Sequence, residues 1–389
     1  MLDINKIRST TPGSNHHIHF NNAGASLPDQ SVIDAITKYM NEEALIGGYE
    51  LMVKHADALE NIYHSIAKMI GANRNEIALF QSATAAWAAA FNAISFQPGD
   101  EVLCSEAEYG SNYLNFLRKQ KTEGIVIKIV PSDADGCLDL ERMEEMMNPK
   151  VKLIAITHVP SNGGLINPAE KVGVIAKKYN CLYLLDACQS VGQIPLEVKN
   201  IDCDFLAVTG RKYLRAPRGT GFLYARASTF DKLDPTVLDL SSANWLSTTE
   251  YQLAPDAKRF ELFETNKSLQ LGLGAAVDYY LSQDPVACFA RIQTLATRLR
   301  DGLSQIPGFT CTDIGREKCG IVTFQKEDLD SVQLKTTLFD KGLYTSAVFP
   351  SAALIDAQKR SLTSLVRASV HYYNTEEEVD RMLNVLEGL

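Results

Sequence analysis

Two side chains, Asp186 and Lys212, have types and positions that could support catalysis. Asp186 directly follows the apolar residues 182–185, and Lys212 stands shortly after the apolar run 205–208. Runs this short, ended by polar residues or glycine, are typical of buried parallel strands. Because the carboxyl ends of such strands meet at one edge of an open α/β sheet, we expect the acid and the amine at the same edge.

An acid and an amine at one sheet edge suit pyridoxal phosphate. The lysine amine forms a Schiff base with the cofactor's aldehyde, and a carboxylate keeps the pyridine nitrogen protonated so that the ring can accept electrons. Lys212 follows Asp186 by 26 residues, and this spacing alone would equally fit a structural ion pair. The motifs around the two residues favour the cofactor.

Several short motifs occur in order along the chain. They are His158-Val159, Asn167-Pro168, Asp186-Ala187-Cys188-Gln189, Cys203-Asp204-Phe205 and Thr209-Gly210-Arg211-Lys212. Over residues 22–374 the sequence resembles the class V aminotransferase and cysteine desulfurase group of fold-type I pyridoxal phosphate enzymes. The resemblance implies a pyridoxal phosphate cofactor, a small amino acid substrate and a homodimer.

The resemblance also assigns roles around the cofactor ring. Lys212 becomes the Schiff-base lysine and the base that moves the substrate's α-proton. Asp186 pairs with the ring nitrogen, and Gln189 pairs with the ring hydroxyl. Tyr109 replaces a histidine that stacks on the ring in the desulfurases, with a core tyrosine as the alternative. Asn162 is expected near the ring hydroxyl and the substrate.

The cofactor phosphate is expected at the start of an alanine-rich helix, where free N–H groups and the helix dipole attract a dianion. The resemblance places Ser82, Ala83 and Thr84 at this position. It adds Thr209 and Arg211 as further phosphate contacts. Arginine stands where the desulfurases have histidine, and a guanidinium also binds phosphate. An ordinary helix N-cap is the structural alternative for the serine.

The substrate carboxylate is expected at Arg367, because a planar guanidinium binds a carboxylate through two parallel hydrogen bonds. By resemblance, Ala23 and Gly24 line the same site. A strand-end salt bridge is the structural alternative for Arg367. In that case Arg215 or Arg218 would hold the carboxylate instead.

The sequence departs from the desulfurases at two places. Their persulfide chemistry needs a thiolate on a loop before the arginine, but no cysteine occurs from Gly320 to the C-terminus. Their Gly-Thr pair, which reaches the phosphate across the dimer, is replaced by Phe263-Glu264. An ionised Glu264 cannot serve as a phosphate ligand. Because the loop cysteine is missing, a cysteine desulfurase is disfavoured.

Residues 161–164 and 211–221 look more like the branch of the hercynylcysteine sulfoxide lyases. Those enzymes cleave a β C–S bond without a catalytic cysteine. The sequence therefore predicts a C–S β-lyase that acts on a cysteine conjugate or sulfoxide. A class V aminotransferase or an epimerase is the alternative, since the core motifs do not separate these reactions. A non-enzymatic regulator ranks low because Lys212 and Asp186 are both present.

The length of 389 residues predicts two domains. Strand and helix patterns alternate over residues 76–179, which indicates a doubly wound, mainly parallel α/β sheet. Further helices are expected at residues 29–44 and 53–70, and residues 230–263 read as irregular.

We predict the fold type I of pyridoxal phosphate-dependent transferases. Its large sheet domain would span residues 20–284, and residues 1–19 and 285–389 would form a smaller α+β domain.

Charge and composition disfavour several other functions. The net charge of −9 and the pI of about 5.4 argue against nucleic acid or an anionic membrane as a partner. No apolar run approaches a membrane span, and the first seventeen residues lack a signal core, so we expect a cytoplasmic protein. The eight cysteines contain no CxxC pair, and no metal is expected.

Overall fold

A computed structural model describes residues 2–389 and contains a central sheet of seven strands. The strand order is β2-β8-β7-β6-β5-β3-β4. The strands are β2 (Ile77–Phe80), β3 (Glu101–Ser105), β4 (Val126–Val130), β5 (Val151–Thr157), β6 (Leu182–Asp186), β7 (Phe205–Thr209) and β8 (Gly221–Ala225). β8 runs antiparallel to β2 and β7, and the other neighbours are parallel. The predicted, mainly parallel sheet is therefore confirmed.

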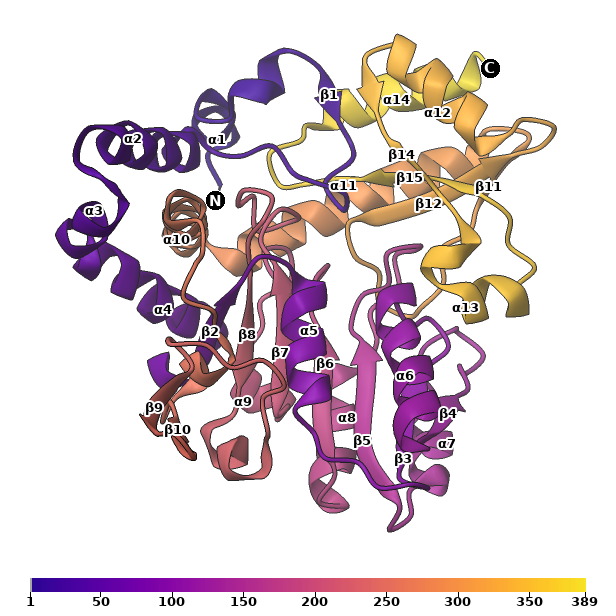
Figure 1. Cartoon of the computed structure of the whole chain (residues 1–389). Coiled ribbons are helices and arrows are strands. Elements are labelled where there is room, and N and C mark those ends of the chain that lie inside the picture. Colours follow the sequence, from indigo (N-terminus) through magenta and orange to yellow (C-terminus); the bar gives the residue numbers. More distant parts are fainter. Residues whose placement is uncertain (1) are drawn as a thin grey trace.

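Helices cover both faces of this sheet, as the alternating pattern predicts. They include α5 (Ala83–Asn92), α6 (Gly110–Glu123), α7 (Leu140–Met146), α8 (Ala169–Lys178) and α9 (Val198–Ile201). One apolar core joins the sheet to α5 and α6, and a second joins its other face to α8 and α9. Figure 1 shows α5 and α6 in front of the strands and α8 behind them.

Three helices before the sheet replace the two that the sequence predicts. They are α2 (Gln30–Ile46), α3 (Gly48–Lys54) and α4 (Ala56–Ile70), and α10 (Lys267–Ser282) packs against the first and last of them. α2 ends at Gly47, whose φ of 91° breaks the helix. Residues 45–52 lie outside both predicted helices, and in the structure they form the end of α2 and most of α3, because the glycine separates two helices directly.

The C-terminal part contains a second, antiparallel sheet of order β11-β12-β15-β14. Its elements are α11 (Pro285–Gln305), β11 (Phe309–Cys311), β12 (Ile321–Lys326), α12 (Ser331–Asp340), β13 (Leu343–Tyr344), β14 (Ser346–Val348), α13 (Leu354–Lys359), β15 (Leu365–Ser369) and α14 (Glu376–Glu387). Figure 1 shows this part above the carboxyl ends of the central strands.

The N-terminal residues pack into this second part. α1 (Ile4–Ser9) precedes β1 (Ile18–His19), which pairs in parallel with β13. Ile7 and Phe20 belong to the same apolar core as the C-terminal strands. The segment that follows β1 is therefore held between the two sheets.

Residues 230–263, predicted to be irregular, contain a hairpin of β9 (Ala243–Ser247) and β10 (Glu250–Leu253). Most of its side chains are exposed, and Trp245 is 76% exposed. Because neither face of the hairpin is buried, its sequence lacks the alternation by which strands are recognised. Among the described residues, no helix is long and apolar enough to cross a membrane.

Arg215 ties both ends of the chain to the central sheet. Its guanidinium donates to the Leu27 carbonyl at 2.8 Å, to Thr11 Oγ1 at 2.6 Å and to the Tyr372 hydroxyl at 3.2 Å. It also lies 4.9 Å from the centre of the Tyr373 ring, a cation–π distance. Arg215 is fully engaged in these contacts and buried. These contacts leave its guanidinium nitrogens occupied, which disfavours Arg215 as the alternative holder of a substrate carboxylate.

Candidate active site

The ends of three neighbouring parallel strands bring the predicted residues together. Thr157 ends β5 beside Asp186 at the end of β6, and Thr209 ends β7. Lys212 lies in the turn after β7, and its carbonyl accepts the Arg215 N–H at 2.9 Å. A cavity of about 180 Å³ is lined by these strand ends. The acid and the amine therefore share one edge and one cavity.

Nine predicted cofactor residues line this cavity, namely Ser82, Ala83, Thr84, Tyr109, Asp186, Gln189, Thr209, Arg211 and Lys212. At the turn after β5, Ser161 lines the cavity, whereas the Asn162 side chain donates to the Phe349 carbonyl at 3.3 Å. The amide oxygen of Asn162 has no hydrogen-bond partner among residues 2–389. The structure thus separates Asn162 from the cavity wall by one residue.

Lys212 is a buried amine, only 8% exposed. Burial lowers its pKa to about 8, and the positive charges of Arg211 and Arg367 act in the same direction. Cys188 and Asp186 oppose this shift. Part of the Lys212 population is therefore neutral near physiological pH, the form in which an amine acts as a nucleophile or base.

Asp186 is fixed through both of its carboxylate oxygens. Oδ1 accepts the backbone N–H of Cys188 at 3.0 Å, and Oδ2 accepts the side-chain amide of Asn112 at 2.9 Å. The residue is 5% exposed. Because a buried carboxylate is stabilised by such donors, its position in the cavity wall is well defined.

The start of α5 offers an anion site beside the lysine. Ser82 caps the helix, and its Oγ accepts the Ala85 N–H at 3.2 Å. The N–H groups of Ala83 and Thr84 have no acceptor within the helix, as in any first turn. A Cβ at Gly221 would lie 3.3 Å from the Ala83 nitrogen and 2.5 Å from the Val208 carbonyl. Glycine therefore allows β8 to pass close to this helix start.

The N-terminal segment closes the cavity on another side. The Gln189 side-chain amide donates to the Ala23 carbonyl at 3.0 Å, and Arg211 donates to the Gly24 carbonyl. The Gln189 Oε1 atom is buried and has no partner among the described residues. Ala23 and Gly24 thus reach the cavity residues through their backbone, and Arg211 links the cavity to this segment.

Arg367, on β15, contacts the turn after β5 from the second sheet. Its Nη1 donates to the Ser161 carbonyl at 3.0 Å, and its Nη2 donates to Asn21 Oδ1 at 3.4 Å. Its Nε has no partner among residues 2–389. Burial lowers the pKa of Arg367 to about 10, and Arg211 adds to this shift. A buried guanidinium with a free donor is suited to bind an anion.

Sequence reasoning missed several residues of the cavity wall, among them Cys188 and Thr157. Both could have been found from position, because Thr157 ends a predicted strand and Cys188 lies two residues after Asp186. Burial raises the pKa of the Cys188 thiol well above its usual value, and the Asp186 charge adds to this, although Lys212 opposes it. The thiol is therefore neutral and a poor nucleophile.

The loop that would carry a desulfurase cysteine has no thiol. It follows β14, and its Phe349 carbonyl contacts Asn162, so it reaches the same side of the site. Cys319 is fully buried, and burial raises its pKa to about 12. Among residues 2–389, no group of three metal-ligating side chains comes together.

Comparisons with known proteins give one family. The family described as aminotransferase class-V matches residues 18–382. A probable cysteine desulfurase from Methanothermobacter thermautotrophicus is 28% identical over 98% of this chain and 97% of its own length.

Solved structures give the same fold. The apo cysteine desulfurase from Thermococcus onnurineus NA1 is 27% identical, with a TM-score of 0.93 over 100% of this chain and 98% of that chain. The cystine C–S lyase C-DES, solved with cysteine persulfide, has a TM-score of 0.87 at 21% identity, over 97% of this chain and 99% of that chain. A C-DES variant carries glycine covalently linked to its pyridoxal phosphate.

Proposed function

Because this chain belongs to the class V aminotransferase family of pyridoxal phosphate enzymes, we propose that it cleaves the β C–S bond of a cysteine conjugate or sulfoxide. The observation that carries this proposal is a cavity with a buried lysine and acid but without a reactive thiolate. In such a reaction the sulfur group leaves, and the three-carbon fragment takes up water and ends as pyruvate and ammonia. The resemblance of residues 161–164 and 211–221 to the hercynylcysteine sulfoxide lyases supports this class of substrate.

The residues of the cavity fit pyridoxal phosphate. When bound, this cofactor supplies an electron sink for negative charge at the substrate's α-carbon. The free N–H groups at the start of α5, together with Thr209, suit its phosphate. The unpartnered Oε1 of Gln189 can accept a hydrogen bond from the ring hydroxyl. Tyr109 supplies an aromatic face, and Lys212 is the amine for covalent attachment.

Three side chains then have distinct tasks at the substrate. Lys212, as a neutral amine, accepts the proton from the substrate's α-carbon. Asp186 holds a proton on the ring nitrogen of the cofactor. Arg367 binds the substrate carboxylate and thereby orients the bond from the α-carbon to its proton. The same contact selects α-amino acids, because without it any primary amine would compete for the site.

The relatives are named cysteine desulfurases, and the desulfurase reaction requires a thiolate that attacks the substrate sulfur. In this chain the loop after β14 contains no cysteine, and Cys188 is a neutral thiol next to Asp186. The fold does not distinguish desulfuration from elimination, since it is shared with a cysteine desulfurase and with a cystine C–S lyase. The missing thiolate therefore favours elimination over desulfuration.

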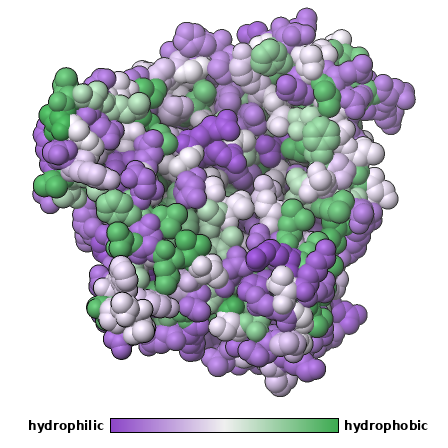
Figure 2. All heavy atoms as spheres, in the orientation of Figure 1, coloured by the Kyte–Doolittle hydropathy of each residue, from purple (hydrophilic) through white to green (hydrophobic). Residues whose placement is uncertain are grey.

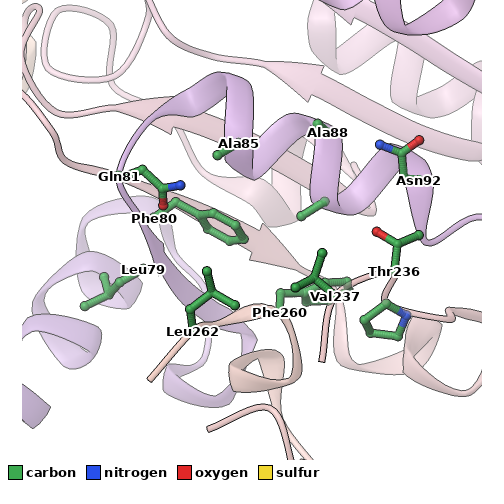
Figure 3. A pocket seen from close by; sticks show the side chains of 12 residues that line it. Leu79, Phe80, Gln81, Ala85, Ala88, Asn92, Thr236, Val237, Phe260 and Leu262 are labelled. Atoms are coloured by element: carbon green, nitrogen blue, oxygen red, sulfur yellow. The ribbon is translucent and has the colours of Figure 1, made fainter. Parts of the chain in front are cut away.

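We also propose that the chain forms a homodimer through an apolar surface beside α5. A pocket of about 260 Å³ lies there, and Figure 3 shows Phe80, Ala85, Val237 and Leu262 around it. Figure 2 shows further hydrophobic residues at the left edge of the molecule, where Figure 1 places α3. Phe263, an aromatic residue that is 42% exposed, adds to the exposed apolar surface.

The dimer can be tested by light scattering. It should give twice the mass of the 42.9 kDa chain, and the mass of a single chain would refute the dimer.

The choice of reaction can be tested by product analysis. Purified enzyme should release pyruvate and ammonia in equal amounts from a cysteine S-conjugate or a cysteine sulfoxide. Free cysteine should yield no sustained alanine, because no thiolate is present to take the sulfur. Chromatographic quantification of both products measures the ratio. Alanine with a persulfide on the enzyme would support a desulfurase, and keto-acid exchange between amino donors would support an aminotransferase.

The role of Arg367 can be tested with Arg367→Lys. An ammonium cannot reproduce the two parallel hydrogen bonds of a guanidinium. Loss of a charge-assisted contact of roughly 1.5–3 kcal/mol should lower kcat/KM for α-amino acids by about one to two orders of magnitude. The absorption spectrum of the bound cofactor should stay unchanged. Arg218→Lys, at an exposed arginine of the cavity rim, is the matched control. A larger loss in that control would assign the carboxylate to Arg218.

A further inference from the structure

Behind Asp186 lies a second buried carboxylate, Glu108, and one amide joins the two. The Asn112 side-chain nitrogen donates to Asp186 Oδ2 at 2.9 Å and to Glu108 Oε1 at 2.9 Å. All three residues are at least 95% buried. An amide NH₂ group has two hydrogens, so Asn112 donates one to each carboxylate. The three side chains form a continuous network that begins outside the cavity and ends at its wall.

Sheet order explains why these residues meet. Glu108 follows β3, Asn112 lies in the first turn of α6, and Asp186 ends β6. β5 runs between β3 and β6 in the sheet, and Thr157 at its end also contacts the network. Adjacent strands are about 4.8 Å apart. Their carboxyl ends therefore place the two acids within reach of one bridging amide.

The remaining partners of Glu108 are all donors. Its carboxylate accepts from Thr157 Oγ1 at 2.6 Å, from the Thr157 N–H at 3.1 Å and from the Tyr109 N–H at 3.1 Å. Burial raises the pKa of Glu108 to about 7, and the charge of Asp186 adds to this, while these donors lower it. The buried thiol of Cys104 is the other titratable group that faces Glu108. Because burial raises its pKa to about 7, Glu108 is partly ionised near neutral pH, and the donors around it favour the ionised form.

Three cavity residues are held by Glu108, and Thr157 is one of them, because it donates to the Glu108 carboxylate through its N–H and its hydroxyl. Asp186 is reached through the Asn112 amide, and Tyr109 is reached through its own backbone N–H. Glu108 itself does not line the cavity. It can therefore act only by holding other groups and by adding negative charge behind Asp186.

We propose that Glu108 and Asn112 are positioning residues that aim Asp186 into the cavity and strengthen its hold on the proton of the cofactor's ring nitrogen. This inference rests on the proposed role of Asp186. Asn112 fixes the orientation of the carboxylate. When Glu108 is ionised, its charge makes the region behind Asp186 more negative, which stabilises a protonated, positively charged ring.

The holoenzyme carrying isotope-labelled pyridoxal phosphate provides the test. The NMR shift of the ring nitrogen reports its protonation directly, without turnover. In Glu108→Gln and in Asn112→Leu, the pH at which the ring nitrogen loses its proton should fall by about one unit, a tenfold weaker hold on the proton. We expect kcat to fall about tenfold and KM to change less than about threefold, since substrate contacts remain.

Asn148→Ala is the matched control. The Asn148 amide donates to the Glu101 carboxylate at 2.8 Å, at the opposite end of the same sheet. This variant removes the same kind of asparagine–glutamate contact and should leave the ring nitrogen and kcat unchanged. Urea unfolding of all variants separates a loss of stability from a change in protonation.

The outcomes distinguish the two levels of the proposal. If the wild-type ring nitrogen is protonated and both network variants keep its titration unchanged, the positioning role is refuted while the role of Asp186 stands. If the wild-type ring nitrogen carries no proton at neutral pH, the role of Asp186 itself fails. A shift in Asn112→Leu alone would support the role of Asn112, the direct contact of Asp186, and would refute the role of Glu108.

Discussion

Positive charge buried without a carboxylate partner is the constraint on which this site depends. Burial outweighs the attraction of Asp186 and lowers the pKa of Lys212, and the side-chain partners of Arg367 are a carbonyl and an amide oxygen rather than a carboxylate. An unpaired buried charge costs several kcal/mol. An anionic ligand would offset that cost, which supports our proposal that a cofactor phosphate and a substrate carboxylate bind at this site. The helix start at Ser82 supplies donors for one of these anions.

The fold maintains this arrangement by fastening the N-terminal segment between its two sheets. The side-chain amide of Asn22 donates to the Ser369 carbonyl at 2.7 Å, and the Ala23 N–H donates to Ser369 Oγ at 2.8 Å. Arg215 adds the contacts to Thr11 and Tyr372 from the turn that carries Lys212. It takes a φ of 63°, a left-handed conformation that non-glycine residues adopt rarely. The buried hydrogen bonds of its guanidinium stabilise that conformation.

Much of this site followed from local sequence signals. Asp186, Thr209 and Lys212 stand at strand ends that short apolar runs reveal, and Ser82 begins a helix that its alanines reveal. The partners of these residues could not be found in the same way. The bridge from Asn112 to Asp186 depends on sheet order, and the burial of Arg215 depends on both chain ends. Gly47 and the exposed hairpin of β9 and β10 were missed because a single residue and an unburied strand leave no periodic pattern.

We propose Lys212 as the amine that holds the cofactor, and borohydride reduction of the holoenzyme tests this role. Reduction fixes the cofactor to its lysine, and peptide mass mapping then locates it. One labelled peptide, containing Lys212, is expected, with no label at that site in Lys212→Arg. A label on another lysine, or a wild-type enzyme that binds the cofactor without becoming labelled, would contradict the account.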